Sequence, residues 1–148
     1  MYICKNLKMG CLVALDFGEK RTGIAHTDPF QIIASGLTTL SPNETLIFLE
    51  EYILKNDVEA IIVGQPKQKD GSFSSVESHI LKFIFKLQNK LSNIKIIRHD
   101  ERYTSKIASQ VIVDSGIKKS KRKNKLLVDQ ISATVILQSY LEFKNFQK

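Results

Sequence analysis

Long apolar runs, paired cysteines and internal repeats are all missing from this sequence. None of its apolar runs approaches the roughly 18–20 residues of a membrane-spanning helix, and its first ten residues lack the apolar segment of a secretory signal. Cys4 and Cys11 are not in CxxC spacing, and no Cys/His cluster accompanies them to complete a zinc site. We therefore expect a cytoplasmic protein with reduced thiols and no membrane contact.

The most distinctive feature of the sequence is its excess of positive charge. The 148 residues include 22 Lys and Arg against 15 Asp and Glu, a formal net charge of +7. The segment Ile117–Lys125 holds six of these cations and no acid, so the rest has 22 − 6 = 16 cations against 15 acids, or +1. A concentrated basic segment favours a polyanionic partner. We expect residues 117–125 to be a mobile segment that either contacts this partner or is merely solvated.

Short apolar stretches typical of strands alternate with segments of helical periodicity. The predicted strands are Cys11–Leu15, Ile24–Thr27, Ile32–Leu40, Ala60–Val63 and Ile94–Ile97. Only a glycine-bracketed turn separates the first two, which favours an antiparallel hairpin. The later strands alternate with helices, so we predict one α/β domain over residues 1–148, with a mixed sheet and helices packed around it.

Helices are expected between and after the later strands. They begin at Pro42, near Ser74, at Thr104 or Ser105, and near Lys125, the last one reaching about Phe143. Ser74 and Glu77 have the spacing of a capping box, and Gly64–Gly71 before them is predicted to be a loop.

Acids follow two of the predicted strands. Asp16 follows five apolar residues, at the carboxyl end of a strand, where ligands collect in open α/β sheets. Its alternative role is to cap the turn that contains Gly18. Asp100 and Glu101 follow the last predicted strand, either as ligands or as surface partners of neighbouring cations.

Asp129 is a carboxylate on the apolar face of the last predicted helix. It shares that face with Ala133, Ile136 and Tyr140, whereas Gln130 starts the stripe expected to face solvent. A carboxylate among apolar side chains is unfavourable unless something compensates it. The alternative is a helix N-cap, if the helix begins one residue later.

Converging carboxylates repel each other unless a proton or a cation lies between them. Oxygen ligands without Cys or His suit a hard ion, Mg²⁺ or Mn²⁺. Two such ions about 4 Å apart can activate a water and stabilise the leaving oxygen of a phosphodiester. The acids and the basic segment together therefore predict metal-dependent cleavage of nucleic acid.

Four segments in order along nearly the whole chain resemble the YqgF family. They are LDFGEKRTGIAHTD (15–28), IIVGQPKQKDGS (61–72), DERYTS (100–105) and KKSKRKNKLLVDQISATVILQSYL (118–141). The family comprises pre-16S rRNA nucleases related to the RuvC Holliday-junction resolvases. The resemblance implies an RNase H-like fold: a mixed five-stranded sheet with antiparallel first three strands and helices on both faces. Residues 1–8 precede the usual family start, so we expect a flexible extension, with Met9 as an alternative initiator.

The resemblance also implies roles for individual residues. Asp16, Glu101 and Asp129 would be the catalytic acids that bind Mg²⁺ or Mn²⁺, although strand alternation leaves open whether Asp100 or Glu101 faces the metal. Arg21 and Arg102 match basic family positions and would contact phosphates or pair with nearby acids. The basic segment would hold the nucleic-acid backbone through Lys118, Lys119, Lys121, Arg122, Lys123 and Lys125.

Three functions follow from these features. The first is a cytoplasmic metal-dependent endonuclease, a hydrolase acting on ester bonds, that processes the 5′ end of pre-16S rRNA in ribosome biogenesis. The second is a Holliday-junction resolvase acting on branched DNA, and the third is a non-catalytic RNA-binding ribosome assembly factor. We expect a monomer or a weak homodimer.

Overall fold

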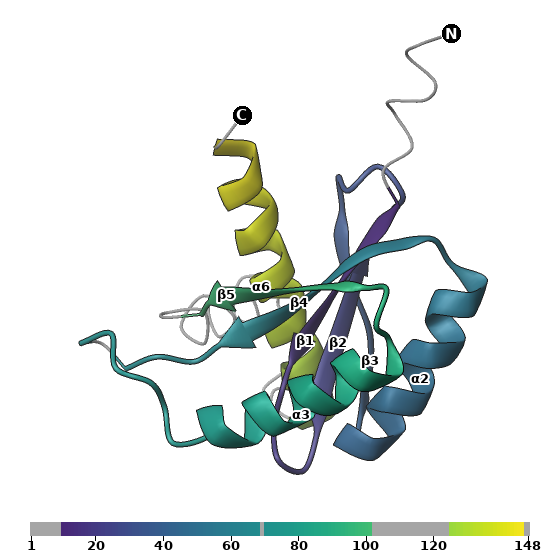
Figure 1. Ribbon diagram of the computed structural model, residues 1–148. Coiled ribbons are helices and arrows are strands. Elements are labelled where there is room, and N and C mark those ends of the chain that lie inside the picture. The colour runs from purple at the N-terminus through teal and green to yellow at the C-terminus, as the bar shows by residue number, and fades with distance from the viewer. Residues whose placement is uncertain (1–9, 69, 102–124, 147–148) are drawn as a thin grey trace, which may run out of the picture.

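Eight helices and strands build the part of the protein that the computed structural model describes, residues 10–68, 70–101 and 125–146 (Figure 1). In chain order they are β1 Cys11–Asp16, β2 Thr22–Thr27, β3 Ala34–Leu40, α2 Pro42–Lys55, β4 Val58–Gln65, α3 Glu77–Lys90, β5 Lys95–Asp100 and α6 Lys125–Phe146. The helix predicted from Thr104 or Ser105 lies outside the described residues. So do residues 1–8, for which a flexible extension was predicted, and all of the basic segment except Lys125.

The strands form one mixed sheet in the order β3-β2-β1-β4-β5. β1 pairs antiparallel with β2, and β2 pairs antiparallel with β3, whereas β4 is parallel to both β1 and β5. The predicted five-stranded sheet with antiparallel first three strands is therefore confirmed. Strands β1, β4 and β5 all end at the same edge of the sheet, because they run in the same direction.

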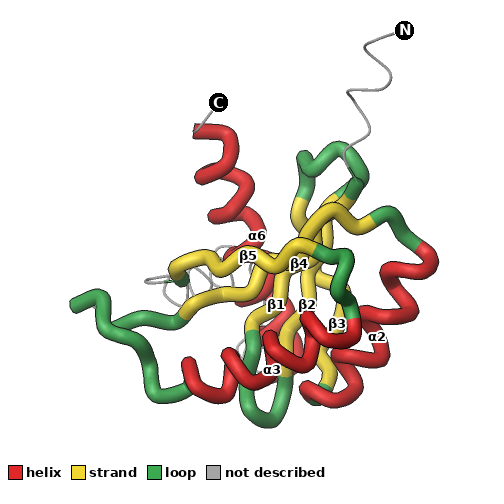
Figure 2. Tube along the Cα trace, in the orientation of Figure 1, coloured by secondary structure: helices red, strands yellow, loops and turns green. Residues whose placement is uncertain are grey.

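Helices cover both faces of the sheet, as predicted (Figure 2). α2 and α3 pack on one face, where Val13 and Leu15 of β1 contact a core that includes Leu49 and Leu87. On the other face, the alternate β1 residues contact α6. The sequence of β1 reads as a continuous apolar run because this central strand is buried on both sides.

Local signals place two elements differently from the prediction. β3 begins at Ala34 rather than Ile32, because the Asp28 carboxylate accepts backbone N–H bonds from Phe30, Ile32 and Ile33 and holds that segment in a turn. β4 extends through Gly64 and Gln65, which were predicted to be loop.

The predicted capping box at Ser74 is wrong, and a real one occurs at Ser41. The Ser41 hydroxyl accepts from the Glu44 N–H at 3.3 Å, and the Glu44 carboxylate accepts from the Ser41 N–H at 3.2 Å. α3 instead starts at Glu77 without a side-chain cap, because the Glu77 carboxylate is drawn into an ion pair with Arg98, 2.7 Å away.

The polar stripe of α6 does not all face solvent. Gln130 and Thr134 lie over Gly36 of β3, where a Cβ atom would come within 3.4 Å of either side chain. The Thr39 hydroxyl of β3 also donates to the Leu126 carbonyl at 2.7 Å. α6 therefore packs over β3 as well as β1 and β2. None of the helices in the described ranges is long and apolar enough to cross a membrane.

Candidate active site

Asp16 is the last residue of β1, and its carboxylate lies on the face of the sheet that α6 covers. Burial is the main cause that raises its pKa to about 7, and the nearby Asp129 carboxylate raises it further. A carboxylate that merely capped an exposed turn would not be desolvated in this way. Asp16 is therefore placed where a cation would be favourable.

Glu101 directly follows β5, and its carboxylate lies over β4 on the same face as Asp16. Its N–H donates to the Gln65 carbonyl at 3.1 Å, which extends the β4–β5 pairing by one residue. Burial raises the pKa of Glu101 to about 8, with the Asp16 carboxylate as the second cause. Asp100 alternates to the opposite face and forms an ion pair with Lys67 at 3.8 Å. Glu101 is thus the acid of this pair that faces Asp16.

Two glycines make room for the acids around Asp16. Gly23 of β2 is paired with Asp16, and a Cβ at this position would overlap the backbone carbonyl of Asp129. Gly64 of β4 lies beneath Glu101, where a Cβ would overlap its carboxylate and come within 2.8 Å of an Ile136 methyl group. Glycine at both positions therefore allows α6 and the Glu101 side chain to approach β1. Sequence reasoning missed them, although a glycine within a strand is itself a signal of close approach.

Asp129 lies within α6, four residues after its start, so the N-cap alternative is wrong. Its carboxylate accepts a hydrogen bond from Arg21 Nε at 3.0 Å, and the two side chains are 25% and 36% exposed. Arg21 follows the turn between β1 and β2, which explains how a residue far away in sequence reaches α6. Of the two predicted roles of Arg21, pairing with a nearby acid is the one seen in this state.

Arg98 is a supporting residue of the site that the sequence did not reveal. Its guanidinium pairs with the buried Glu77 carboxylate and donates to the backbone carbonyls of Val63 and Gly64 at 3.3 and 3.2 Å. This positive charge partly offsets the rise in the pKa of Glu101. Arg98 therefore ties the ends of β4, β5 and α3 together beneath the acids.

The donor set suits a hard divalent cation. It consists of the carboxylates of Asp16, Glu101 and Asp129. Burial raises the pKa of the first two, and the Asp16 carboxylate adds to the rise at Glu101. No three His, Cys, Asp or Glu side chains are gathered at metal-binding distance within the described residues. The Asp129 carboxylate is directed to Arg21 instead, so it would have to leave Arg21 in order to join Asp16 and Glu101 around an ion.

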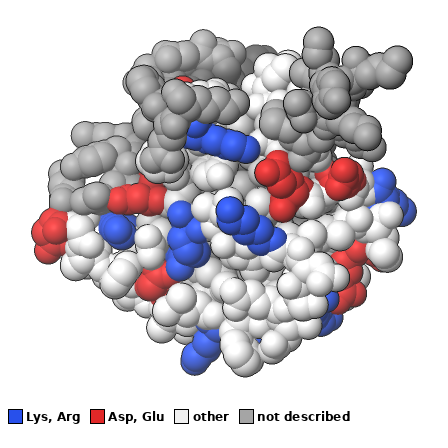
Figure 3. Space-filling model, turned by 45° about the horizontal axis from the view of Figure 1, so that its top comes forward, with Lys and Arg blue, Asp and Glu red and all other residues white. Residues whose placement is uncertain are grey.

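The predicted basic contacts are placed only in part. Arg102 and the cations from Lys118 to Lys123 lie outside the described residues, whereas Lys125 is exposed at the start of α6. On the face shown in Figure 3, basic and acidic side chains of the described residues are interspersed. This agrees with the small net charge of the chain outside the basic segment.

Comparison with solved structures shows the class of fold. The structure of Thermus thermophilus RuvC in complex with a Holliday junction superposes with a TM-score of 0.51 and 12% identity, over 85% of this chain and 90% of that one. A second structure of Thermus thermophilus RuvC gives a TM-score of 0.50 over 90% of this chain and 96% of that one. The chain therefore has the fold of the RuvC nucleases.

Sequence comparison shows the family. Residues 10–143 match the RuvX family, which is described as "Holliday junction resolvase". Relatives named "Putative pre-16S rRNA nuclease" include one from Flavobacterium johnsoniae, 52% identical over 91% of this chain and 98% of its own length. One from Phocaeicola vulgatus is 49% identical over 93% of this chain and 99% of its own length. The chain belongs to the RuvX family, as its resemblance to YqgF proteins implied, and it is a nuclease, a hydrolase acting on nucleic acid.

Proposed function

We propose that this protein is a cytoplasmic, metal-dependent endonuclease that processes the 5′ end of pre-16S rRNA. Asp16, Glu101 and Asp129 would hold Mg²⁺ or Mn²⁺, and the protein would act as a single domain, in a monomer or a weak homodimer. The substrate is suggested by the names of relatives about half identical over nearly their full length.

The observation that carries the proposal is the desolvated carboxylate pair at the carboxyl ends of β1 and β5. Ionising both acids is unfavourable in the metal-free site, because burial raises the pKa of each. The Asp129 carboxylate raises the pKa of Asp16 further, and the Asp16 carboxylate raises that of Glu101. Carboxyl groups with perturbed pKa values at the carboxyl ends of parallel strands are favoured candidates for a functional site.

The chain's own residues would hold the ion and contact the substrate. A bound divalent ion would supply Lewis-acid activation of water and charge stabilisation at the phosphodiester. Asp16 and Glu101 would orient the ion from the rigid sheet, and Asp129 would do so from α6. Arg21, 3.0 Å from Asp129 in this state, would be released to contact a substrate phosphate once Asp129 turns to the ion.

The test is cleavage of two labelled substrates, a precursor 16S rRNA fragment and a four-way DNA junction, each with Mg²⁺ or Mn²⁺. Wild type, Glu101→Gln and Asp129→Asn are compared with Asp100→Asn, which removes the adjacent acid on the opposite face of the sheet. We expect cleavage of the rRNA fragment by wild type and Asp100→Asn, and its loss in the other two variants.

Each other outcome rejects a part of the proposal. Preferential cleavage of the junction would favour the resolvase function that the family description names. Equal cleavage by wild type and Glu101→Gln would show that the acids are assigned wrongly. Binding of the rRNA fragment without cleavage, and without Mn²⁺ uptake by calorimetry, would identify a non-catalytic assembly factor.

A further inference from the structure

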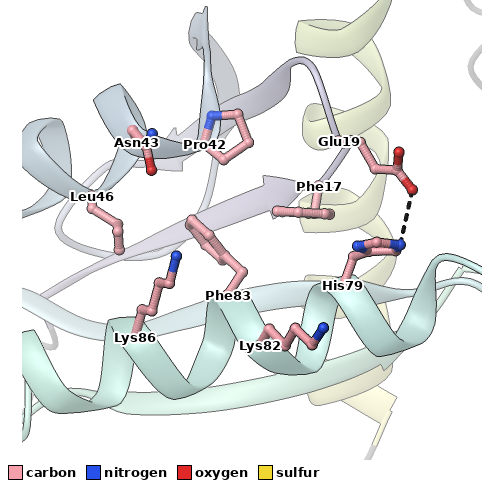
Figure 4. A pocket seen from close by; sticks show the side chains of 9 residues that line it. All are labelled: Phe17, Glu19, Pro42, Asn43, Leu46, His79, Lys82, Phe83 and Lys86. Atoms are coloured by element: carbon pink, nitrogen blue, oxygen red, sulfur yellow. Dashed lines mark ion pairs between the residues drawn. The ribbon is translucent and has the colours of Figure 1, made fainter.

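A cavity of about 260 Å³ lies between α3, the start of α2 and the turn after β1 (Figure 4). It is on the α2/α3 face of the sheet, opposite the carboxylates, but at the same edge. Phe17 lines it and directly follows Asp16 in the chain. The cavity and the candidate active site therefore lie on opposite faces of the sheet, near the end of β1.

The floor of this cavity is aromatic. The rings of Phe17 and Phe83 lie with their centroids 5.1 Å apart and are tilted by 46°, and Leu46 of α2 completes the apolar surface. Aromatic faces of this kind stack with the bases of single-stranded nucleic acid without regard to sequence.

The rim of the cavity is basic. Lys82 and Lys86 lie one turn apart on α3, are exposed, and form no ion pair with any described residue. Their neighbours on the helix differ: Lys90 pairs with Glu50 at 3.3 Å, and His79 pairs with Glu19 at 3.2 Å. Glu19 is the one acid among the described residues that line the cavity, and it lies against His79 rather than against either lysine. Both lysines are therefore open to an anionic ligand beside the aromatic floor.

We propose that this cavity binds one nucleotide of a single-stranded segment of the substrate, with its base against the Phe17 ring and the phosphates on its two sides on Lys82 and Lys86. The strand would then continue around the end of β1 toward the carboxylates on the other face of the sheet. This inference rests on the proposed nuclease function for the nature of the ligand. It assigns to α3 a contact distinct from that of the basic segment.

The test measures binding without cleavage. A labelled single-stranded RNA oligonucleotide is titrated in EDTA, by fluorescence anisotropy at several salt concentrations, against protein carrying Asp16→Asn. Lys82→Gln/Lys86→Gln is compared with a matched control, Lys55→Gln/Lys95→Gln, which removes the same charge from exposed lysines at the other edge of the sheet. Circular dichroism verifies that both double variants are folded.

Two lost phosphate contacts should reduce the log–log salt slope by about 1.4, at about 0.7 per single-strand contact. This corresponds to affinity about tenfold weaker at physiological salt, and the control should match the parent. Bound RNA should also protect Lys82 and Lys86, but not Lys55 and Lys95, from acetylation measured by mass spectrometry. Equal losses in both double variants, or no loss in either, would overturn the proposal.

A second ligand separates base stacking from charge alone. An abasic oligonucleotide of the same length has the same charges at the same spacing but no bases, so it should bind more weakly than RNA and compete poorly for these lysines. Binding of the abasic oligonucleotide as tight as RNA would overturn the role of the aromatic floor. The binding assay in EDTA and the cleavage assay with Mg²⁺ or Mn²⁺ fail independently. Binding that depends on Lys82 and Lys86, with no cleavage in the metal assay, would reject only the nuclease proposal. Cleavage in the metal assay, with RNA binding unaltered in the lysine variant, would reject only this one.

Discussion

Replacing Asp16 by Asn should stabilise the metal-free protein while abolishing its nuclease activity. The reason is that the native site holds a carboxylate that burial and Asp129 make unfavourable to ionise. Asn has nearly the same shape and carries no charge. The variant removes a ligand from the proposed metal site and also removes the cost of a buried negative charge.

The magnitude follows from the pKa of Asp16, which the fold raises from 3.8 to about 7. Below about pH 4 both the folded and the unfolded chain keep the proton, so the difference is absent. Between about pH 4 and 7 the unfolded chain loses the proton first, and the free energy of unfolding falls as pH rises. The full loss is about 4 kcal/mol, at about 1.36 kcal/mol per pKa unit. This is an upper limit, because Asp16 and Glu101 titrate as a coupled pair.

The assay is urea unfolding in EDTA at several pH values from about 5 to 9. Wild type should lose stability over this range, with the Glu101 pKa of about 8 extending the loss above pH 7. Asp16→Asn should be flatter and about 1–3 kcal/mol more stable than wild type near pH 8. Mn²⁺ should restore stability to wild type but not to the variant, and Asp100→Asn, on the opposite face, should resemble wild type. Wild-type stability that is constant with pH, or an Asp16→Asn variant less stable near pH 8, would refute the reasoning.

Three further substitutions test the surroundings of the acids. Arg21→Gln should tighten Mn²⁺ binding about two- to fivefold by calorimetry, because Arg21 and Mn²⁺ compete for the Asp129 carboxylate. A partly exposed ion pair of this kind is worth up to about 1 kcal/mol, and weaker Mn²⁺ binding by the variant would contradict the competition. Gly64→Ala should lower the free energy of unfolding by about 1–3 kcal/mol and reduce cleavage, because the added methyl group overlaps the carboxylate above it; unchanged activity would count against that close approach. Arg98→Met should destabilise the protein by about 3–5 kcal/mol in urea unfolding, because it leaves the Glu77 carboxylate buried and unpaired. Adding Glu77→Gln should recover much of that loss, and a double variant no more stable than Arg98→Met would contradict this explanation.

The sheet could be predicted from the sequence because its signals are local. β1 is buried on both faces and is therefore a continuous apolar run. The short turn between β1 and β2 makes them antiparallel, and the apolar stripe of α3, Ile80 to Leu87, identifies the face that it buries. A strand that ends in an acid places that acid at the edge of the sheet. Asp16 could therefore also be chosen as a candidate metal-binding acid.

The partners of the polar residues could not be predicted in the same way. Ser74 and Glu77 have capping-box spacing, but the buried Glu77 pairs with Arg98, which lies in another strand. Ser41 and Glu44, with the same spacing, do form the box, and Glu44 forms no ion pair with another of the described residues. Local spacing limits which side-chain hydrogen bonds are possible, and the tertiary contacts determine which of them forms.

The order of the strands and the apolar faces of the helices can be read from the sequence, because each depends on apolar periodicity within one segment. Asp16, Glu101 and Asp129 can be chosen as candidates from their positions in these segments and from the family resemblance. The contacts between distant segments were needed to show that Glu101 rather than Asp100 faces Asp16, because this depends on the register between β4 and β5. The same contacts show that Gly23 admits the α6 backbone at Asp129 and that Gly64 admits the Glu101 carboxylate. These contacts join segments far apart in the chain, and their geometry exists only once the sheet has brought the segments together.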